Sequence, residues 1–153
     1  MRFIYRESDL ILIQSKGFYK KINLLNKTTP VKYLPNFYKV KSNDLKLNEK
    51  YDKYFKKKFT FLFAGNLGKA QSLDTLIDAA FLLKNQRDIA FIVIGDGSEK
   101  KRLEDKVDKL CLKNIVFIAQ QPPEAIDSFF KKASALIVSL GDDDVLNLTI
   151  PSK

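Results

Sequence analysis

The chain has 153 residues, 45% hydrophobic and 12% aromatic, so it can bury a core and is expected to form one domain, or one domain and part of another. This composition excludes a disordered or fibrous protein, a single cysteine excludes a disulfide framework, and no apolar run approaches the roughly 20 residues of a membrane-spanning helix. The net charge is +9, and the excess of basic over acidic residues lies within residues 1–60, which hold 15 Lys and Arg against 5 Asp and Glu.

The first part of the chain has a β-α-β pattern. We expect a strand over Asp9–Gln14, a helix over Ser15–Asn26 and a second strand over Val31–Asn36. Ser15 is a residue type that favours the N-cap of that helix. The opening segment lacks a signal-peptide pattern and the chain is poor in cysteine, so the predicted location is the cytoplasm.

A lysine-rich stretch, Lys39–Lys58, follows this pattern and is expected to link it to the rest of the chain. Aromatic residues lie among its lysines, which leaves three interpretations open. A solvated linker is favoured. A contact between the basic N-terminal part and the inner face of a membrane comes second. Nucleic acid is the weakest interpretation and is not expected as a partner, because the chain has only four arginines and no helix-turn-helix or RNA-binding signature.

From Phe59 onward, apolar runs alternate with amphipathic segments. The predicted strands are Phe59–Ala64, Ile89–Ile94, Ile115–Ile118 and Ala135–Leu140, and the predicted helices are Ser72–Asn85, Glu99–Leu110 and Pro123–Lys131. The strand segments are continuous apolar runs, which is typical of parallel strands covered on both faces. The pattern therefore predicts an α/β fold with a doubly wound, Rossmann-like parallel sheet.

In such a fold, ligands bind beyond the carboxyl ends of the strands, so the loops that follow the strands are candidate sites. Glycines directly follow two strands, in "GNLGKAQS" and "GDGSEKK". They permit tight turns or a close approach to a phosphate, and both interpretations stay open. Neither loop has the spacing of a dinucleotide fingerprint or of a P-loop.

The last loop offers two further candidates. Asp142–Asp144 could hold a metal ion, although solvated loop aspartates are the favoured interpretation. Thr149 and Pro151 are typical of a helix start, and the free N–H groups of that start, beside Ser152 and Lys153, would suit a phosphate.

Seven segments together resemble a known family. They are "SDLILIQSKGFYKKI", "VKYLPN", "FLFAGNLGKAQSLDTLIDAA", "FIVIGDGSEKKRLE", "NIVFIAQQPPEAIDSFF", "ALIVSL" and "TIPSK". In this order they resemble a family-4 (group 1) glycosyltransferase of GT-B fold, similar to bacterial surface-polysaccharide members such as the fucosamine transferases. The resemblance implies a truncated chain: residues 1–38 end the N-terminal acceptor-side domain, residues 39–58 are a basic linker, and residues 59–153 are an incomplete nucleotide-sugar-binding Rossmann-like domain.

The resemblance also implies a set of site residues. Donor diphosphate contacts are predicted at Gly65, Asn66, Lys69, Gln71, Ser152 and Lys153, and nucleotide contacts at Gly95, Gly97 and Gln120. Asn66 stands where the family has arginine and Gln71 where it has lysine, so Lys69 is expected to supply the missing charge.

The implied function is transfer, with retention, of a sugar from a nucleotide diphosphate-sugar, expected to be UDP-linked, to a polysaccharide or lipid-linked acceptor. The resemblance implies no metal and no cofactor besides the donor. The family's glutamate pair and its N-terminal histidine have no counterparts here, so the chain alone is expected to be inactive. The alternative is a Rossmann-type module that binds another phosphorylated ligand without transferase activity.

Overall fold

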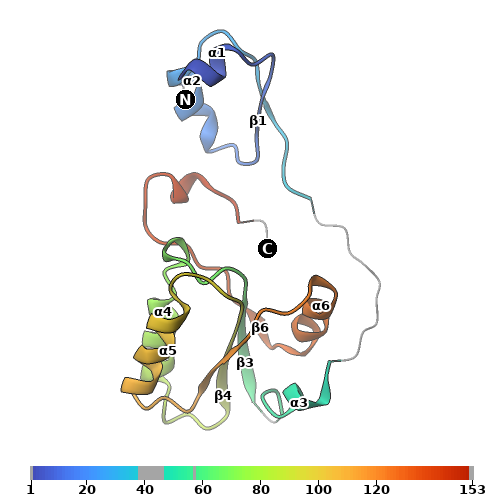
Figure 1. Cartoon of the computed structure of the whole chain (residues 1–153), viewed down its shortest axis with the longest axis vertical. Coiled ribbons are helices and arrows are strands. Elements are labelled where there is room, and N and C mark those ends of the chain that lie inside the picture. Colours follow the sequence, from blue (N-terminus) through green and yellow to red (C-terminus); the bar gives the residue numbers. More distant parts are fainter. Residues whose placement is uncertain (1, 38–46, 57, 152–153) are drawn as a thin grey trace. The chain divides into compact units, whose positions relative to one another are not determined.

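The computed structural model of the chain describes residues 2–37, 47–56 and 58–151 (Figure 1). The chain forms two compact units. The first unit comprises residues 1–40 and 142–153, and the second unit comprises residues 41–141. The segment after Gly141 thus packs with the first residues of the chain, whereas the sequence placed it at the end of the second domain.

The first unit contains the expected β-α-β arrangement. Strands β1 (Ile11–Ile13) and β2 (Val31–Tyr33) pair in parallel, and helix α2 (Phe18–Leu25) connects them. The helix begins three residues later than predicted, because Ser15 forms a turn instead: its Oγ accepts a hydrogen bond from the Gly17 N–H at 3.2 Å. Two short helices of this unit were not predicted, α1 (Arg2–Arg6) and the 3-10 helix η2 (Leu146–Leu148).

The second unit is built on a four-stranded parallel sheet, as predicted. Its strands β3 (Phe59–Ala64), β4 (Ile89–Ile94), β5 (Ile115–Ile118) and β6 (Ala135–Leu136) lie in the order β5-β4-β3-β6. The chain adds strands on one side of β3 and then returns to its other side. The direction of winding therefore reverses between β3 and β6, which is the position where doubly wound sheets bind ligands.

Helices cover both faces of this sheet. Helices α4 (Asp74–Leu82) and α5 (Lys100–Lys109) pack on one face, while α3 (Glu49–Asp52) and α6 (Pro123–Lys132) pack on the other (Figure 1). Successive strand side chains point to opposite faces, so Phe63 joins the first core and Leu62 the second. Two buried faces explain why the strand sequences show no polar alternation.

Part of the predicted linker is a packed element. Asn48 caps α3 by accepting a hydrogen bond from the Lys50 N–H, and the Tyr51 ring lies 5.1 Å from the ring of Phe129 in α6. Residues 47–56 therefore contribute to the core of the second unit, while residues 39–46 and 57 lie outside the described residues. Within the described ranges, no helix has the length and apolar character needed to cross a bilayer.

Candidate functional site

The loops that follow β3 and β4 are joined by backbone hydrogen bonds at the carboxyl edge of the sheet. The Leu67 N–H donates to the Asp96 carbonyl at 2.8 Å, and the Glu99 N–H donates to the Leu67 carbonyl at 2.9 Å. The loop after β6 reaches the same place, because the Gly141 N–H donates to the Ala70 carbonyl at 2.8 Å. Three strand-following loops thus meet beside the point where the winding reverses.

Glycines allow the first two loops to approach so closely. A Cβ at Gly95 would lie 1.9 Å from the Gly65 carbonyl oxygen, and one at Gly97 would lie 2.6 Å from the Leu67 carbonyl. Both glycines also have positive φ angles, +150° and +156°, which side-chain-bearing residues rarely adopt. Loop packing alone therefore accounts for these two glycines, and their predicted contact with a nucleotide stays a prediction.

The amide side chains in the β3 loop are tied to the loop itself. Gln71 Oε1 accepts hydrogen bonds from the Gly68 N–H at 3.1 Å and from Asn66 Nδ2 at 3.3 Å. Because a backbone N–H can only donate, the oxygen of Gln71 must face the loop, which leaves its Nε2 group to donate elsewhere. Asn66 and Gln71 therefore stabilise each other within the loop.

Lys69 lies in the 3-10 helix η1 (Lys69–Gln71) and is exposed. Ser72 follows in a left-handed conformation, with φ of 48°, so the main helix α4 starts at Asp74 and not at the predicted Ser72. Beside Lys69 is a hollow of about 200 Å³. It is lined by Gly68, Lys69, Ser72, Leu73, Asp74, Glu99, Arg102 and Leu103.

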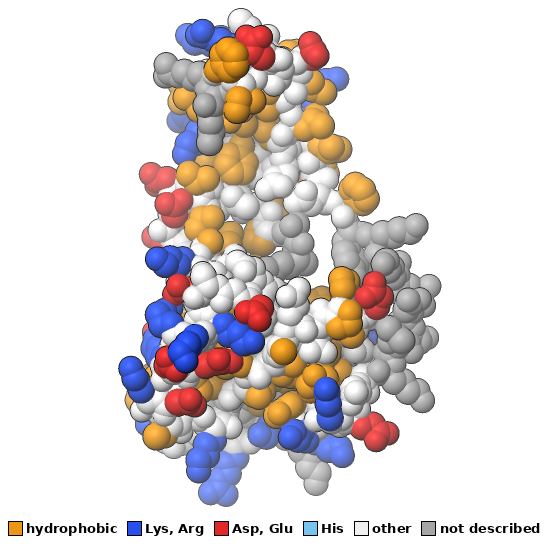
Figure 2. Space-filling model, in the orientation of Figure 1, with side chains coloured by type: hydrophobic (Ala, Val, Ile, Leu, Met, Phe, Trp, Pro, Cys, Tyr) orange, Lys and Arg blue, Asp and Glu red, His pale blue; other side chains and the backbone are white. Residues whose placement is uncertain are grey.

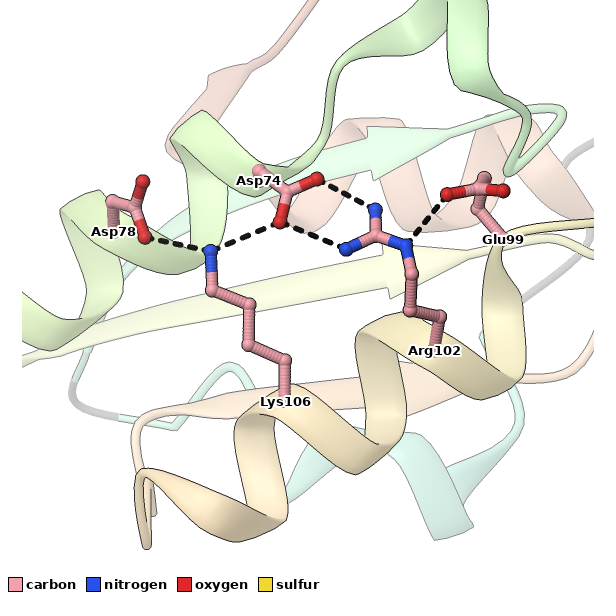
Figure 3. A network of polar contacts seen from close by, with 5 residues as sticks. All are labelled: Asp74, Asp78, Glu99, Arg102 and Lys106. Atoms are coloured by element: carbon pink, nitrogen blue, oxygen red, sulfur yellow. Dashed lines mark hydrogen bonds and ion pairs between the residues drawn. The ribbon is translucent and has the colours of Figure 1, made fainter.

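The hollow's charged lining residues, Asp74, Glu99 and Arg102, belong to a network that joins α4 to α5 (Figure 3). Arg102 contacts both carboxylate oxygens of Asp74, at 3.0 and 2.6 Å. Its Nε also donates to Glu99 at 2.6 Å. Lys106 Nζ bridges Asp74 and Asp78, at 2.9 Å from each. The network ties the first two turns of α4 to α5, and these are the two helices that follow the candidate loops.

These contacts change the acid–base behaviour of the network. The hydrogen bonds from Arg102, and then those from Lys106, lower the pKa of Asp74 well below its ordinary value of 3.8. The hydrogen bond to Asp78 is the main cause that raises the pKa of Lys106. At neutral pH Asp74, Arg102 and Lys106 are therefore charged, and each cation stabilises the charged form of Asp74.

Asp74→Asn is expected to lower the free energy of unfolding by about 1 kcal/mol at pH 7, a modest loss because the side chain is 39% exposed. The pKa of Asp74 is lower in the folded chain than in the unfolded chain. Its contribution is therefore complete above pH 3.8 and declines as the pH falls below that value. Urea unfolding at several pH values should show the difference between wild type and variant shrinking in acid. The matched change Asp78→Asn, at a 63% exposed side chain, should cost less.

The remaining predicted site residues are not all brought to these loops. Gln120 is exposed in the loop after β5. Ser152 and Lys153 lie outside the described residues. Thr149 ends η2, and its Oγ1 donates to the Val145 carbonyl at 3.1 Å. The helix start predicted there would include Ser152 and Lys153, and it stays a prediction.

The aspartates of the last loop shape a turn in the first unit. Asp143 accepts hydrogen bonds from the N–H groups of Val145 and Leu146, at 2.8 and 3.2 Å, and these bonds lower its pKa. Asp142 accepts a hydrogen bond from the Asn147 side chain at 2.8 Å. Among the residues whose positions are described, no three His, Cys, Asp or Glu side chains gather as metal ligands.

Sequence reasoning missed the charged network. Glu99, Arg102 and Lys106 have the three- and four-residue spacing of side chains on one helix face, which is a usable signal. Their partner Asp74 lies 28 positions before Arg102, and nothing in the local pattern connects the two.

Comparison with known proteins gives matches to one family. The family profile described as "Glycosyl transferases group 1" matches residues 46–142. A glycosyl transferase of Escherichia coli named for colanic acid biosynthesis is 31% identical, over 60% of this chain and 22% of its own length. An uncharacterized glycosyltransferase of Methanocaldococcus jannaschii is 29% identical, over 76% of this chain and 30% of its own length. The chain thus spans less than a third of either relative.

Solved structures share the fold at low sequence identity. Anabaena HepE in complex with UDP-glucose matches with a TM-score of 0.71 and 15% identity, over 89% of this chain and 39% of that one. A TarM mutant of S. aureus, in complex with fondaparinux, alpha-GlcNAc-glycerol and UDP, matches with a TM-score of 0.69 and 12% identity, over 88% of this chain and 26% of that one.

Proposed function

The chain belongs to the glycosyl transferases group 1 family and has the parallel α/β fold of GT-B enzymes, and from this premise we propose that it binds the nucleotide diphosphate-sugar donor of a glycosyltransferase. One observation carries the proposal. The loops after β3, β4 and β6 meet beside the reversal of the sheet, where doubly wound folds bind nucleotides. HepE and TarM, which share this fold, are both solved with UDP or a UDP-sugar.

In this proposal the β3 loop holds the donor diphosphate. Lys69 is exposed and contributes the loop's cation, while the free Nε2 of Gln71 and the amide of Asn66 donate hydrogen bonds without neutralising charge. Gly65 gives the phosphates access to the backbone. The further predicted contacts are Ser152 and Lys153 for the diphosphate, and Gly95, Gly97 and Gln120 for the nucleotide.

Family membership extends the proposal to the reaction. The sugar would pass, with retention, to an acceptor glycan or a lipid-linked sugar, and the β3 loop would stabilise the charge that develops on the leaving diphosphate. No metal ion and no cofactor besides the donor is proposed. The chain alone is expected to transfer no sugar, because it spans less than a third of the length of either glycosyltransferase relative. Turnover of a UDP-sugar in the presence of candidate acceptors would contradict this expectation.

A titration with UDP tests donor binding directly. Calorimetry should detect binding, and backbone amide resonances of residues 65–72 should shift more than those of residues at the opposite edge of the sheet. ADP and inorganic phosphate are the matched competitors. If UDP does not bind while another phosphorylated ligand does, the chain is a binding module of a different kind and the donor proposal fails.

Lys69→Ala is expected to weaken UDP binding about tenfold, because a charge-assisted hydrogen bond to phosphate is lost. Lys84→Ala removes the same charge from the far end of α4, where the ammonium lies over the Phe81 ring, and should change UDP binding less than about twofold. Calorimetry gives the UDP dissociation constants of both variants. If both lost the same affinity for UDP, the effect would come from the overall charge of the chain and not from the position of Lys69.

The proposed location is the cytoplasm, with a peripheral contact between the basic N-terminal part and the inner face of the membrane. Residues 1–60 carry the positive surplus that would favour an anionic surface. The vesicle experiment described below also tests this contact.

A further inference from the structure

The end of the sheet where the strands begin, opposite the candidate site, is rich in cations. Lys58 precedes β3, Arg87 precedes β4 and Lys113 precedes β5. The strands are parallel and in register, with Phe59 beside Ile89 and Phe91 beside Ile115. The three cations therefore lie side by side at the end of the sheet where the strands begin. All three are exposed.

The helix ends add to this edge. Helices α4 and α5 run antiparallel to the strands, which places Lys84 and Lys109 at the same end of the second unit (Figure 1). Figure 2 shows the gathering of Lys and Arg side chains at the lower end of the view. A cation in the last helical turn, such as Lys109, complements the helix dipole, but that reason does not apply to Lys58, Arg87 or Lys113.

The cations at the two ends of the parallel strands differ in their ion pairing. Toward the candidate site, Lys100 and Arg102 have carboxylate partners within 3.5 Å, and Lys106, in the last turn of α5, is paired as well. At the strand-start edge, Lys58, Arg87, Lys109 and Lys113 have no ion-pair partner among the residues that the structure describes. Asp88, directly before β4, and Asp108, beside Lys109, are exposed at the same end, so Lys58, Lys84, Arg87, Lys109 and Lys113 leave a positive surplus there. Such a surplus raises the local positive potential, which favours an anionic partner.

Apolar side chains lie at the same edge. Leu82, at the end of α4, is 81% exposed. Phe81 is 39% exposed, and Lys84 Nζ lies 4.1 Å from the centre of its ring. A soluble polyanion would use only the cations, whereas a bilayer surface with anionic headgroups would also accept the apolar side chains.

We propose that this strand-start surface, defined by Lys58, Leu82, Lys84, Arg87, Lys109 and Lys113, binds a membrane that contains anionic lipids. The sheet would then stand on the bilayer with the candidate donor loops at its far end. The six residues of β3 rise about 3.3 Å each, so the Gly65 loop would lie roughly 20 Å above the strand starts. Apart from Lys58, which both include, the surface is distinct from the N-terminal contact proposed above, and it does not depend on donor binding.

Co-sedimentation of the full chain with vesicles tests this surface. The chain should bind vesicles of phosphatidylcholine and phosphatidylglycerol at roughly two to one, should not bind phosphatidylcholine alone, and should be released by salt. The triple variant Lys58→Gln, Arg87→Gln, Lys113→Gln should weaken binding about tenfold or more. The matched control Lys20→Gln, Lys27→Gln, Lys32→Gln removes equal charge from exposed positions of the first unit and should have less than about a twofold effect.

Leu82→Ser separates lipid from other anions. It should weaken vesicle binding about fivefold at a salt concentration where the wild type still binds, because the apolar contribution is lost. The proposal would be overturned if the two triple variants lost vesicle binding equally, or if the wild type bound neutral vesicles as well as anionic ones. It would also be overturned if a nucleic-acid duplex fully displaced the chain from vesicles and Leu82→Ser had no effect on vesicle binding. A loss confined to the first-unit variant would also overturn it, and would support the N-terminal contact instead. Circular dichroism checks that each variant is folded.

Discussion

Gly95→Ala is expected to lower the free energy of unfolding of the second unit by about 3 kcal/mol or more. The added Cβ would lie 1.9 Å from the Gly65 carbonyl oxygen, which belongs to the backbone and cannot move without displacing the β3 loop. The φ angle of +150° adds strain for any residue with a Cβ. Hydrogen exchange of the slowest β3 and β4 amides measures the loss within this unit.

Gly68→Ala is the matched control in the same pair of loops. Its Cβ would approach the end of the Asn66 side chain at 2.6 Å, and that amide can rotate away. The φ angle of −108° is accessible to alanine. The control should cost less than about 1 kcal/mol. If both variants lost the same stability, the close approach of the two loops would not be what requires glycine at position 95.

Leu67→Ala should reduce the free energy of unfolding by about 2–4 kcal/mol and also weaken UDP binding about tenfold. The Leu67 side chain is 0% exposed and anchors the β3 loop in the core shared with α4 and α5. Its removal leaves a cavity directly under the residues proposed to hold the diphosphate. Urea unfolding and UDP calorimetry, below the unfolding temperature of the variant, measure the two effects separately.

Ile77→Ala tests whether the loss of binding is specific. Ile77 is 1% exposed in the same core, but it lies within α4 and away from the loop. The variant should lose a similar amount of stability and retain wild-type UDP affinity. A parallel loss of affinity would show that Leu67 acts through general stability and not through the position of the loop.

The arrangement of strands and helices in the second unit could be predicted because the sequence signals were long and consistent. The runs at β3, β4 and β5 are continuous and apolar, and their predicted bounds are those of the structure. The predicted strand from Ala135 to Leu140 is equally apolar but pairs over only two residues. Beyond Leu136, Val138 is 56% exposed at an edge that no further described strand covers. Apolar composition alone does not reveal where pairing stops.

Short elements and distant contacts escaped prediction. Helix α3 has four residues, and its lysines resembled a solvated linker, although Tyr51 packs on Phe129 in a helix far along the chain. In the candidate site, the sequence identified the glycines after β3 and β4 as positions where another group could approach the backbone closely. It could not identify which residues make that approach. Gly65 and Gly95 directly follow the neighbouring strands β3 and β4, so they come into contact only once these strands have paired.

The self-pairing of Gln71 with Gly68 and Asn66 has a consequence for the end of the proposed catalytic cycle. In the β3 loop, neutral amides and Lys69 give a diphosphate less Coulombic energy than two further fixed cations would at the positions of Asn66 and Gln71. The spent nucleotide would therefore leave sooner, and it would compete less with fresh donor. In enzymes whose turnover is limited by product release, weaker retention of the leaving group favours faster cycling.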